Sequence, residues 1–299
     1  MSETVFAHRA GTVAIVGRPN VGKSTLLNHL VGCKLSITSS RPQTTRLRIT
    51  GIVTRAGAQI VFVDTPGYQT EHDNALNRVM NRSVAASLHE VDAVVWMVEA
   101  LKFDGRDQQL AKVLPPDARV ILAINKTDAV KEKNRLLPFI AGLSAHRRFE
   151  AIIPISAAKG SQIDTLLDAI VPLLPEGPPL HAADELTTVN ERLLAAELLR
   201  EKLFRQLGEE LPYAATVEIE QFKHEGDMRR IAASILVDKD SQKAIVIGKR
   251  GAKLKEIATR ARQDMERLFG GKVFLEVWGK VRRGWANSES ALKRMGFGE

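Results

Sequence analysis

The sequence has a single cysteine, Cys33, in 299 residues, so no disulfide can form within the chain. Such a composition is typical of a reducing compartment, and we expect the protein in the cytoplasm. The longest apolar run, Ala93 to Val98, is far shorter than the roughly 20 residues that span a bilayer. The N-terminal residues contain no apolar signal segment, and Ser2 stands where myristoylation needs glycine. We therefore expect any contact with a membrane to be peripheral.

Excess positive charge is confined to the last fifth of the chain. Residues 241–299 carry 14 Lys and Arg against 6 Asp and Glu, and the rest of the chain holds 29 of each sign. The net charge of +8 is therefore local. A local basic surface indicates a nucleic acid or an anionic membrane as partner, whereas the same charge spread evenly would indicate little beyond solubility.

The first part of the chain, residues 1–174, alternates short β-branched runs with longer segments of helical period. That order predicts an α/β fold with a mixed, mostly parallel sheet and crossover helices. The segment from Leu47 to Thr54 alternates apolar and polar residues instead, which predicts an antiparallel edge strand. The runs that we expect to form the other strands are TVAIVG, QIVFVD, DAVVWMVEA, RVILAIN and AIIPIS.

Four prolines and a glycine between Pro172 and Pro179 predict a linker, which we place at 175–189. Residues 190–280 then predict a smaller α+β domain, and 281–299 a basic tail. The elements expected in this domain are a helix at 190–208, strands at 214–222 and 229–237 joined by a turn at 223–228, a short helix at 241–247, a turn, a helix at 252–268 and a strand at 272–278.

The stretch GRPNVGKS, Gly17 to Ser24, follows a predicted strand, opens a predicted helix and matches G-x-x-x-x-G-K-[ST]. Its glycines let backbone N–H groups surround a phosphate, Lys23 brings a cation to the outer phosphates, and Ser24 offers a hydroxyl to Mg²⁺. A purely structural turn is the lesser alternative, because chance supplies this pattern in roughly one such chain in a hundred. The nucleotide-binding residues predicted here are Gly17, Arg18, Pro19, Asn20, Val21, Gly22, Lys23, Ser24 and Thr25.

Further motifs end predicted strands at one edge of the sheet, where open α/β sheets bind ligands. DTPG, Asp64 to Gly67, places a carboxylate beside the phosphates, and NKTD ends another strand with Asp128. An ionised Asp128 can accept from guanine N1–H and from the N2 amine, a donor pair that adenine lacks. The Ala157 amide is a candidate donor to guanine O6, so the predicted base is guanine. These motifs add Asp64, Thr65, Pro66, Gly67, Asn125, Lys126, Asp128, Ser156 and Ala157 to the predicted nucleotide site.

The polar stretch RPQTTRLR, Arg41 to Arg48, lies between the first helix and the edge strand. A threonine there can reach the metal and sense the γ-phosphate. We favour Thr45 over Thr44, although a solvated polar loop is an equally good reading of either residue. The predicted metal ligands are then Ser24, Thr45 and Asp64, and the predicted catalytic residues are Lys23, Thr45 and Gly67.

A second glycine-framed basic turn, GKRG at Gly248 to Gly251, lies between two predicted helices. It lacks a hydroxyl after its lysine and the four-residue spacer, which argues against a second nucleotide site. Both glycines allow close approach to a sugar-phosphate backbone, and helix N-termini favour phosphates. Trp285 either stacks on a base or packs within the tail. The predicted contacts to single-stranded RNA are Gly248, Lys249, Arg250, Gly251, Lys253 and Lys255.

With these motifs the chain resembles the Era family of bacterial ribosome-assembly GTPases, and its second domain resembles a type II KH fold. GRPNVGKST, PQTTR, DTPG, NKTD and SA stand in the family's order, and the resemblance covers almost the whole chain. It implies an Mg²⁺-dependent enzyme that converts GTP to GDP and binds the 3′ end of 16S ribosomal RNA. It also implies a role in 30S subunit assembly and some peripheral association with the inner membrane.

Tyr68 departs from the Ras-like pattern, because it stands where those proteins keep the glutamine that orients the attacking water. We therefore expect slow intrinsic hydrolysis, with the group that positions the water left open. The same residue motivates an alternative, an RNA-binding protein whose nucleotide domain is structural and turns over negligibly. An ATPase is disfavoured by Asp128. Nothing in the sequence requires more than a monomer.

Overall fold

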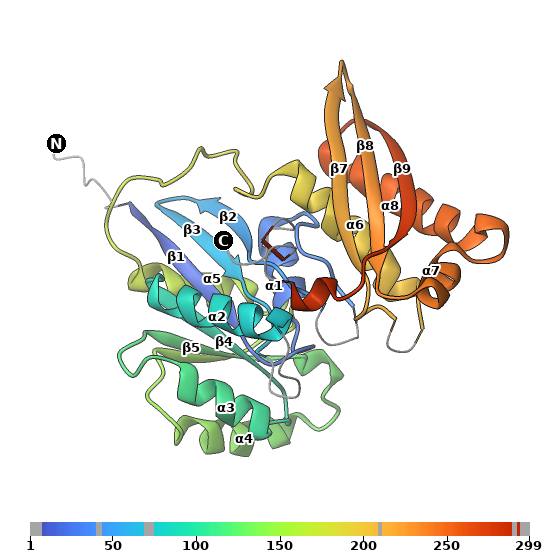
Figure 1. The fold of residues 1–299 in the computed structure, drawn as a ribbon. Coiled ribbons are helices and arrows are strands. Elements are labelled where there is room, and N and C mark those ends of the chain that lie inside the picture. Colours follow the sequence, from blue (N-terminus) through green and yellow to red (C-terminus); the bar gives the residue numbers. More distant parts are fainter. Residues whose placement is uncertain (1–7, 40–43, 69–74, 209–210, 289–291, 294–299) are drawn as a thin grey trace, which may run out of the picture. The chain divides into compact units, whose positions relative to one another are not determined.

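The computed structural model describes residues 8–39, 44–68, 75–208, 211–288 and 292–293 (Figure 1). Internal contacts divide the chain into two compact units. The first contains residues 1–36, 45–71 and 80–188, and the second contains residues 37–44, 72–79 and 189–299. The chain therefore enters the second unit and returns to the first twice before the long C-terminal segment begins.

The first unit is built on a six-stranded sheet with the order β2-β3-β1-β4-β5-β6. Only β2 is antiparallel to its neighbour, with Ile49 opposite Asp64, and it forms one edge of the sheet. The mixed, mostly parallel sheet and the antiparallel edge strand are both confirmed. The strands are β1 (Arg9–Val16), β2 (Ile49–Arg55), β3 (Ala58–Asp64), β4 (Ala93–Glu99), β5 (Val120–Asn125) and β6 (Ala151–Pro154).

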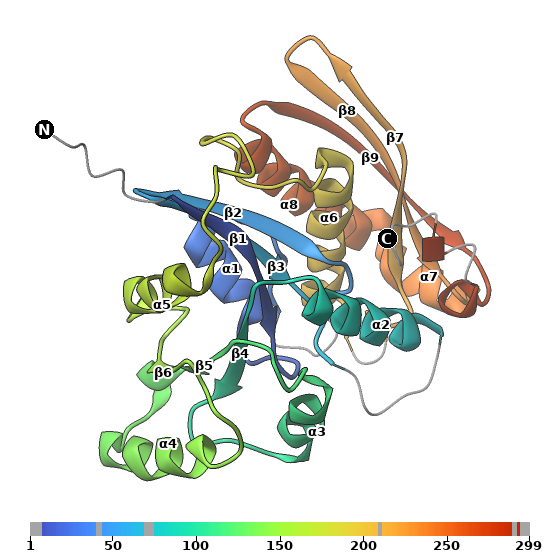
Figure 2. The ribbon, with the colours of Figure 1, turned by 90° about the vertical axis from the view of Figure 1, so that its left-hand side faces the viewer.

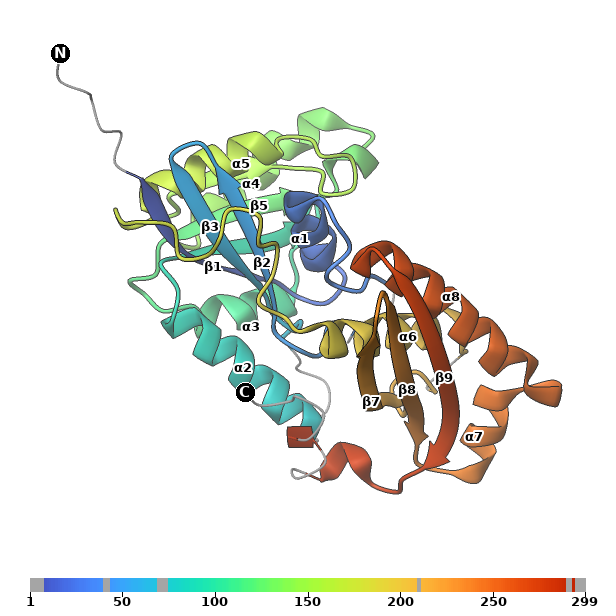
Figure 3. The same cartoon turned by 90° about the horizontal axis from the view of Figure 1, so that it is seen from above.

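Helices cover both faces of this sheet, which explains why its central strands are apolar throughout. One face packs against the second, third and fourth helices through a buried cluster around Trp96, which is 1% exposed. Figure 3 shows α1 and α5 on the face opposite α2 and α3. The helices are α1 (Lys23–Val31), α2 (Ala75–His89), α3 (Gly105–Val113), α4 (Leu136–Ser144) and α5 (Ile163–Ile170), with short 3₁₀ turns η1 (Thr127–Ala129), η2 (Lys133–Arg135) and η3 (Val171–Leu173).

The proline-rich segment that follows η3 is bound to the first unit along its length. Near its start Arg9 donates to the carbonyl of Leu174, and further on Gln59 holds the amide of His181 at 2.8 Å. The amide of Ile52 in β2 then donates to the carbonyl of Leu186 at 2.8 Å. These bonds satisfy backbone groups that an edge strand would otherwise leave unpaired.

The second unit carries a three-stranded sheet with the order β7-β8-β9, in which β7 and β8 are antiparallel and β8 and β9 parallel. The expected turn at 223–228 is too wide, because cross-strand pairs such as Lys223 with Arg230 extend β7 to Glu225. The last strand also runs three residues further than expected, to Val281. The elements are α6 (Glu191–Gln206), β7 (Thr216–Glu225), β8 (Met228–Val237), α7 (Asp240–Ile247), η4 (Lys249–Gly251), α8 (Ala252–Phe269), β9 (Lys272–Val281) and η5 (Trp285–Asn287).

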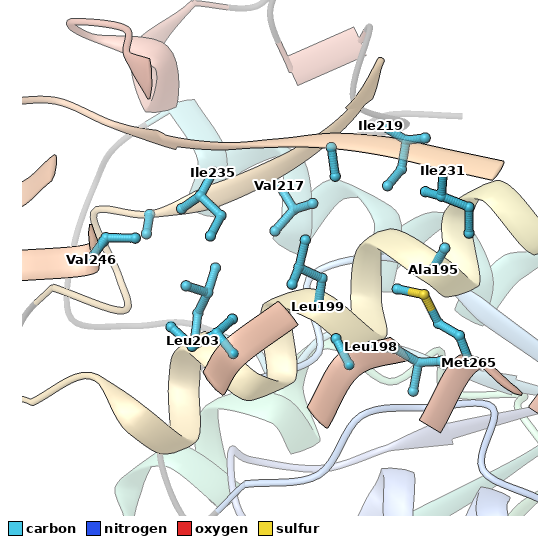
Figure 4. Close-up of a cluster of buried hydrophobic side chains, with 14 of the residues drawn as sticks. Ala195, Leu198, Leu199, Leu203, Val217, Ile219, Ile231, Ile235, Val246 and Met265 are labelled. Atoms are coloured by element: carbon cyan, nitrogen blue, oxygen red, sulfur yellow. The ribbon is translucent and has the colours of Figure 1, made fainter. Parts of the chain in front are cut away.

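The core of the second unit lies between one face of this sheet and the helices α6 and α8. Leu199 of α6, Ile235 of β8 and Met265 of α8 are each fully buried within it (Figure 4). Local signals define both helices: the Asn190 side chain accepts from the amide of Leu193 at the start of α6, and Gly270 ends α8 in the left-handed conformation. The predicted helix–strand–strand–helix–turn–helix–strand order is confirmed.

Candidate nucleotide-binding site

The phosphate loop joins the end of β1 to the start of α1, so it lies at the carboxyl edge of the sheet. Gly22 caps the helix with φ +106°, a conformation that L side chains rarely adopt. A Cβ at this position would lie 2.3 Å from the side-chain nitrogen of Asn125. The glycine therefore allows the loop to approach the NKTD motif while directing α1 and its positive end toward the loop.

Lys23 is buried, and its Nζ donates to the carbonyl oxygens of Gly17 at 2.9 Å and Arg18 at 3.1 Å. Burial lowers the pKa of Lys23 from 10.5 to about 8, against an opposing effect from the carboxylate of Asp64. A phosphate beside the ammonium group would favour its charged form. The loop therefore holds a cation that is stabilised more strongly by an anionic ligand than by the protein itself.

This pKa predicts a pH-dependent proton uptake when GDP binds. Below pH 8 Lys23 is already charged, whereas above pH 8 the bound phosphates must recharge it, so affinity falls as pH rises. We expect uptake of about three quarters of a proton at pH 8.5 and about one tenth at pH 7.0. Calorimetry in two buffers of different ionisation enthalpy measures this number. Equal uptake at both pH values would contradict the assignment.

The predicted metal ligands lie together. Ser24 Oγ donates to Asp64 Oδ2 at 2.7 Å and is 2.7 Å from Thr45 Oγ1. The other carboxylate oxygen, Asp64 Oδ1, is buried and has no hydrogen-bond partner in the described part of the chain. Burial raises the pKa of Asp64, which a cation would counter. Two hydroxyls and an unpartnered carboxylate oxygen fit Mg²⁺, which prefers oxygen ligands.

Ser36 is a residue of this site that the sequence reasoning missed. It is 1% exposed, and its Oγ donates to Asp64 Oδ2 at 2.7 Å. Asn28 of α1 fixes it, because Asn28 Oδ1 accepts from the Ser36 amide at 2.8 Å and its Nδ2 donates to the Ser36 carbonyl. The segment after α1 has no periodic pattern, so no sequence signal marks Ser36.

The NKTD asparagine connects three parts of the site. Asn125 Nδ2 donates to the carbonyl of Val21 in the phosphate loop at 2.7 Å, and Asn125 Oδ1 accepts from the Ala157 amide at 2.9 Å. A contact from Ala157 to guanine O6 would share that hydrogen with Asn125, so this contact stays a prediction. The buried amide of Asn125 thus sets the position of the phosphate loop relative to the base-binding loops.

Asp128 lies beyond the end of β5 in the turn η1, with its carboxylate accepting from Ser156 Oγ at 2.6 Å. That hydrogen bond holds the pKa of Asp128 below its ordinary value, so the group is an acceptor near neutral pH. Ser156 therefore orients the carboxylate that we predict to read guanine. The structure brings Asn125, Asp128 and Ala157 to one edge of the sheet, as parallel strands require.

A charged cluster beside the site was not expected from the sequence. Glu99, at the end of β4, accepts from Lys126 at 2.7 Å and from Arg18 of the phosphate loop at 3.4 Å, and it also pairs with Lys102. Burial works to raise the pKa of Glu99, but the hydrogen bonds from Lys102 and Lys126 outweigh it and lower the pKa. Arg18 also contacts the buried carboxylate of Asp107 at 3.2 Å. One carboxylate therefore links the phosphate loop to the NKTD loop.

Replacing Glu99 with glutamine should accelerate GDP release about tenfold, because the partners Arg18, Lys102 and Lys126 lose the negative charge that they pair with. The matched control is Glu132→Gln, since Glu132 is exposed, lies near the same loops and makes no ion pair among the described residues. Stopped-flow release of a fluorescent GDP analogue measures both rates. The cluster has no role in nucleotide retention if the two variants release GDP equally fast.

DTPG packs against the phosphate loop. Thr65 Oγ1 donates to the carbonyl of Ile15 at 2.9 Å, and a Cβ on Gly67 would lie 3.0 Å from Pro19. Tyr68 is half-buried and packs against the hydrophobic cluster under α2 and α3. It is thus a packing side chain in this structure, consistent with the expectation that it does not replace a water-orienting glutamine.

The second glycine turn connects α7 to α8. Gly248 has φ +71°, and a Cβ there would lie 2.7 Å from the Cβ of Lys253. Lys249 and Arg250 are exposed at its tip, and Lys255 is exposed in the first turn of α8. Four cationic side chains therefore surround the N-terminus of an 18-residue helix, which suits phosphates.

The structure decides between the two alternatives for Trp285. This residue is fully buried and its Nε1 donates to the carbonyl of Ala214 at 3.0 Å, so Trp285 packs and does not stack on a base. Beside the turn, Val246 and Ile257 belong to the core, whereas Ile245 is 50% exposed and is accessible to an unstacked base.

The fold and site together define a GTP-hydrolysing P-loop protein joined to a KH domain. The family model described as "50S ribosome-binding GTPase" matches residues 12–126, and the model described as "KH domain" matches residues 210–286. No helix in the described ranges is long and apolar enough to cross a membrane.

Curated relatives define the family. The chain is 53% identical to "GTPase Era" of Nitrosomonas eutropha over 97% of this chain and 98% of the relative. It is also 53% identical to "GTPase Era" of Chromobacterium violaceum over 99% of this chain and 100% of the relative. The chain belongs to the Era family of GTPases.

Solved structures agree with this assignment. A variant of Aquifex aeolicus Era bound to GDP.AlF4- aligns with a TM-score of 0.93 at 39% identity, covering 97% of this chain and 100% of that one. Era in complex with MgGDPNP and nucleotides 1506–1542 of 16S ribosomal RNA aligns with a TM-score of 0.93 at 39% identity, covering 98% and 100%.

Proposed function

We propose that this GTPase is a switch that binds the 3′ end of 16S ribosomal RNA and assists assembly of the 30S subunit. GTP and Mg²⁺ occupy the first unit, and single-stranded RNA binds at Gly248 to Gly251 in the second. Support comes from a relative crystallised with MgGDPNP and this RNA segment, and from the exposed cationic turn. We further propose a cytoplasmic monomer that associates peripherally with the inner membrane.

One observation supports a nucleotide-dependent switch. Thr45, the proposed γ-phosphate sensor, lies beside Ser24 in the first unit, whereas the preceding residue, Thr44, belongs to the second unit. There the Thr44 carbonyl accepts from Arg200 of α6, and the Thr38 amide donates to Glu201 of the same helix at 3.2 Å. A movement of Thr45 on GTP loss would therefore pull on a segment that is hydrogen-bonded to the first helix of the RNA-binding unit.

In the proposed chemistry, the phosphate-loop amides and Lys23 hold the β- and γ-phosphates. Ser24 and Asp64 hold Mg²⁺, which neutralises developing charge, and Thr45 completes the metal-side shell. The Gly67 amide is the proposed contact that places the DTPG loop against the γ-phosphate. Because Tyr68 is packed into the hydrophobic cluster, no side chain of the described loop orients water, and intrinsic turnover should be slow.

Charge removal at the second turn tests RNA binding. Lys249→Ala/Arg250→Ala should weaken binding to an RNA ending in the 16S 3′ sequence and lower the slope of log affinity against log salt by about 1.4, or about 0.7 for each lost phosphate contact. The control is Arg267→Ala, a 77% exposed side chain in the last turn of α8, far along the helix from the glycine turn. Filter binding across a salt series measures both.

Coupling is tested in the same proteins by following GTP hydrolysis with and without this RNA. We expect RNA to stimulate GTP hydrolysis in the parent protein and in Gly248→Ala, but not in Gly248→Asp. Because both variants add a Cβ at the same left-handed position, this difference would indicate an effect of charge. RNA affinity that is identical in the GTP and GDP forms would remove the switch and leave an RNA-binding GTPase without nucleotide control.

A further inference from the structure

The two oxygens of the Asp64 carboxylate have different surroundings in the described part of the chain. Oδ2 accepts from Ser24 Oγ and from Ser36 Oγ, each at 2.7 Å. A carboxylate oxygen has two lone pairs, so these two hydroxyls fill the acceptor capacity of Oδ2. Oδ1 is buried and has no hydrogen-bond partner within the same ranges. Oδ1 is therefore the oxygen left for a ligand.

The two hydroxyls on Oδ2 differ in where they lie. Ser24 is in the first turn of α1, and its Oγ is also 2.7 Å from Thr45 Oγ1, so it faces the proposed metal. Ser36 lies outside the phosphate-loop motif and is 1% exposed. Because a hydroxyl has one hydrogen, the donor of Ser36 is committed to Asp64. Ser36 is thus placed to orient the carboxylate from the side away from Ser24 and Thr45.

Asn28 of α1 holds the main chain of Ser36 with both of its amide atoms. Its Oδ1 accepts from the amides of Leu35 at 2.9 Å and Ser36 at 2.8 Å, and its Nδ2 donates to the carbonyl of Ser36 at 2.7 Å. The helix α1 lies against β2 and β3, and β3 ends at Asp64 (Figure 2). A regular helix therefore sets the position of the Ser36 hydroxyl relative to the strand that carries the carboxylate.

Two donors on one oxygen fix the plane of the Asp64 carboxylate. With Ser24 as its one donor, the group could turn about its last side-chain torsion, which has a broad energy minimum in aspartate. Mg²⁺ demands nearly ideal octahedral geometry, whereas Ca²⁺ accepts more oxygens in flexible arrangements. A fixed carboxylate therefore favours the smaller ion, and a loosened carboxylate loses part of that preference.

We propose that Ser36, held by Asn28, is a positioning residue that fixes the Asp64 carboxylate and thereby gives the site its selectivity for Mg²⁺ over Ca²⁺. Groups that orient a metal ligand from behind typically contribute about 10- to 100-fold to metal affinity. This inference rests on the proposed function, because it takes Ser24, Thr45 and Asp64 to be the metal side of the GTP site. It adds two residues outside the sequence motifs to those that decide which ion the GTPase uses.

The test measures the affinity for a fluorescent GDP analogue in EDTA, in Mg²⁺ and in Ca²⁺. By linkage, the factor by which a metal raises GDP affinity is the factor by which GDP raises the affinity for that metal. For Ser36→Ala we expect the Mg²⁺ factor to fall about tenfold, and the Ca²⁺ factor to change less than about threefold. The affinity in EDTA should stay within about twofold of the parent protein, which also shows that the variant is folded.

The matched control is Ser87→Ala. Ser87 is fully buried in α2, and its Oγ donates to the carbonyl of Ser83 at 2.8 Å, so the control removes an equally buried hydroxyl away from Asp64. All three affinities should be those of the parent protein.

A double-mutant cycle tests whether Asn28 acts through Ser36. Asn28→Ala should lower the Mg²⁺ factor to a similar extent, and Asn28→Ala/Ser36→Ala should lower it no further than Ser36→Ala does. Losses that multiply in the double variant would mean that Asn28 acts on the metal without Ser36, which contradicts the proposal.

Each other outcome also overturns the inference. Equal losses in EDTA, Mg²⁺ and Ca²⁺ would make Ser36 a support of the phosphate loop with no role toward the metal. Equal falls in the Mg²⁺ and Ca²⁺ factors would leave Ser36 without a role in selectivity, and no fall in either would leave it a packing residue. A parent protein whose GDP affinity is the same in EDTA and in Mg²⁺ would refute the metal site of the proposed function itself, before variants are compared.

Discussion

Asp128→Asn is expected to convert the nucleotide preference from guanine to xanthine. The carboxylate accepts from both N1–H and the N2 amine of guanine, whereas an amide would present its NH₂ to that amine, donor against donor. Losing two hydrogen bonds to a charged group should lower GDP affinity by about 10²-fold or more. Xanthine carries a carbonyl in place of the N2 amine, so it can accept from the new amide and should bind the variant more tightly than guanine does.

Competition between GDP and XDP for a fluorescent analogue measures this change. Ser156→Ala is the matched control, because it removes the hydroxyl that orients Asp128 without altering the acceptor, at 2.6 Å in the structure. That variant should lose affinity but keep its preference for guanine. If Asp128→Asn still prefers guanine, then Asp128 does not recognise the base and this assignment is refuted.

Lys23→Ala should reduce GTP turnover by about 10³-fold, the upper range for deleting one charged donor to a transition state. In the structure its Nζ lies inside the phosphate loop, held by two loop carbonyls rather than by an acid. The charge is therefore available for phosphates, since Lys23 forms no ion pair within the described ranges of the chain. Single-turnover release of phosphate from radiolabelled GTP measures the rate.

The RNA affinity of Lys23→Ala in the absence of nucleotide provides the control for folding, and it should equal that of the parent protein. If Lys23→Ala hydrolyses GTP as slowly as the parent protein does, then this turnover does not come from the phosphate loop. The alternative reading, an RNA-binding protein with a structural nucleotide domain, would then be preferred over an enzyme.

The meeting of the proposed nucleotide-site motifs at one sheet edge could be predicted, because these motifs are local and end parallel strands. A strand followed by Gly17 to Ser24, and others ended by Asp64 and Asn125, must meet at one edge of the sheet. Ser36 could not be predicted, because the segment after α1 has no periodic pattern. Glu99 ends a predicted strand, but nothing in that strand indicates its partners Arg18 and Lys126, which come from other loops. Their roles depend on which loops the fold brings together.

In the second unit, too, the features set by local sequence were predicted and those set by distant contacts were not. Helix boundaries were predicted within about two residues, because Asn190 and Gly270 are strong local cap signals. The wide turn at 223–228 was wrong, and the sequence could not choose between stacking and packing for Trp285, because both outcomes depend on contacts between distant segments. Pairing with β8 extends β7 into the expected turn, and Ala214 holds the indole of Trp285.

The segment after η3 also protects the first unit from association through its sheet edge. Its hydrogen bonds to β1, β2 and β3 continue to Thr188, whose hydroxyl meets that of Thr50. An uncovered edge strand is a template on which another chain can add a strand. Because this segment lies along β2, the first unit does not offer that template at Ile52.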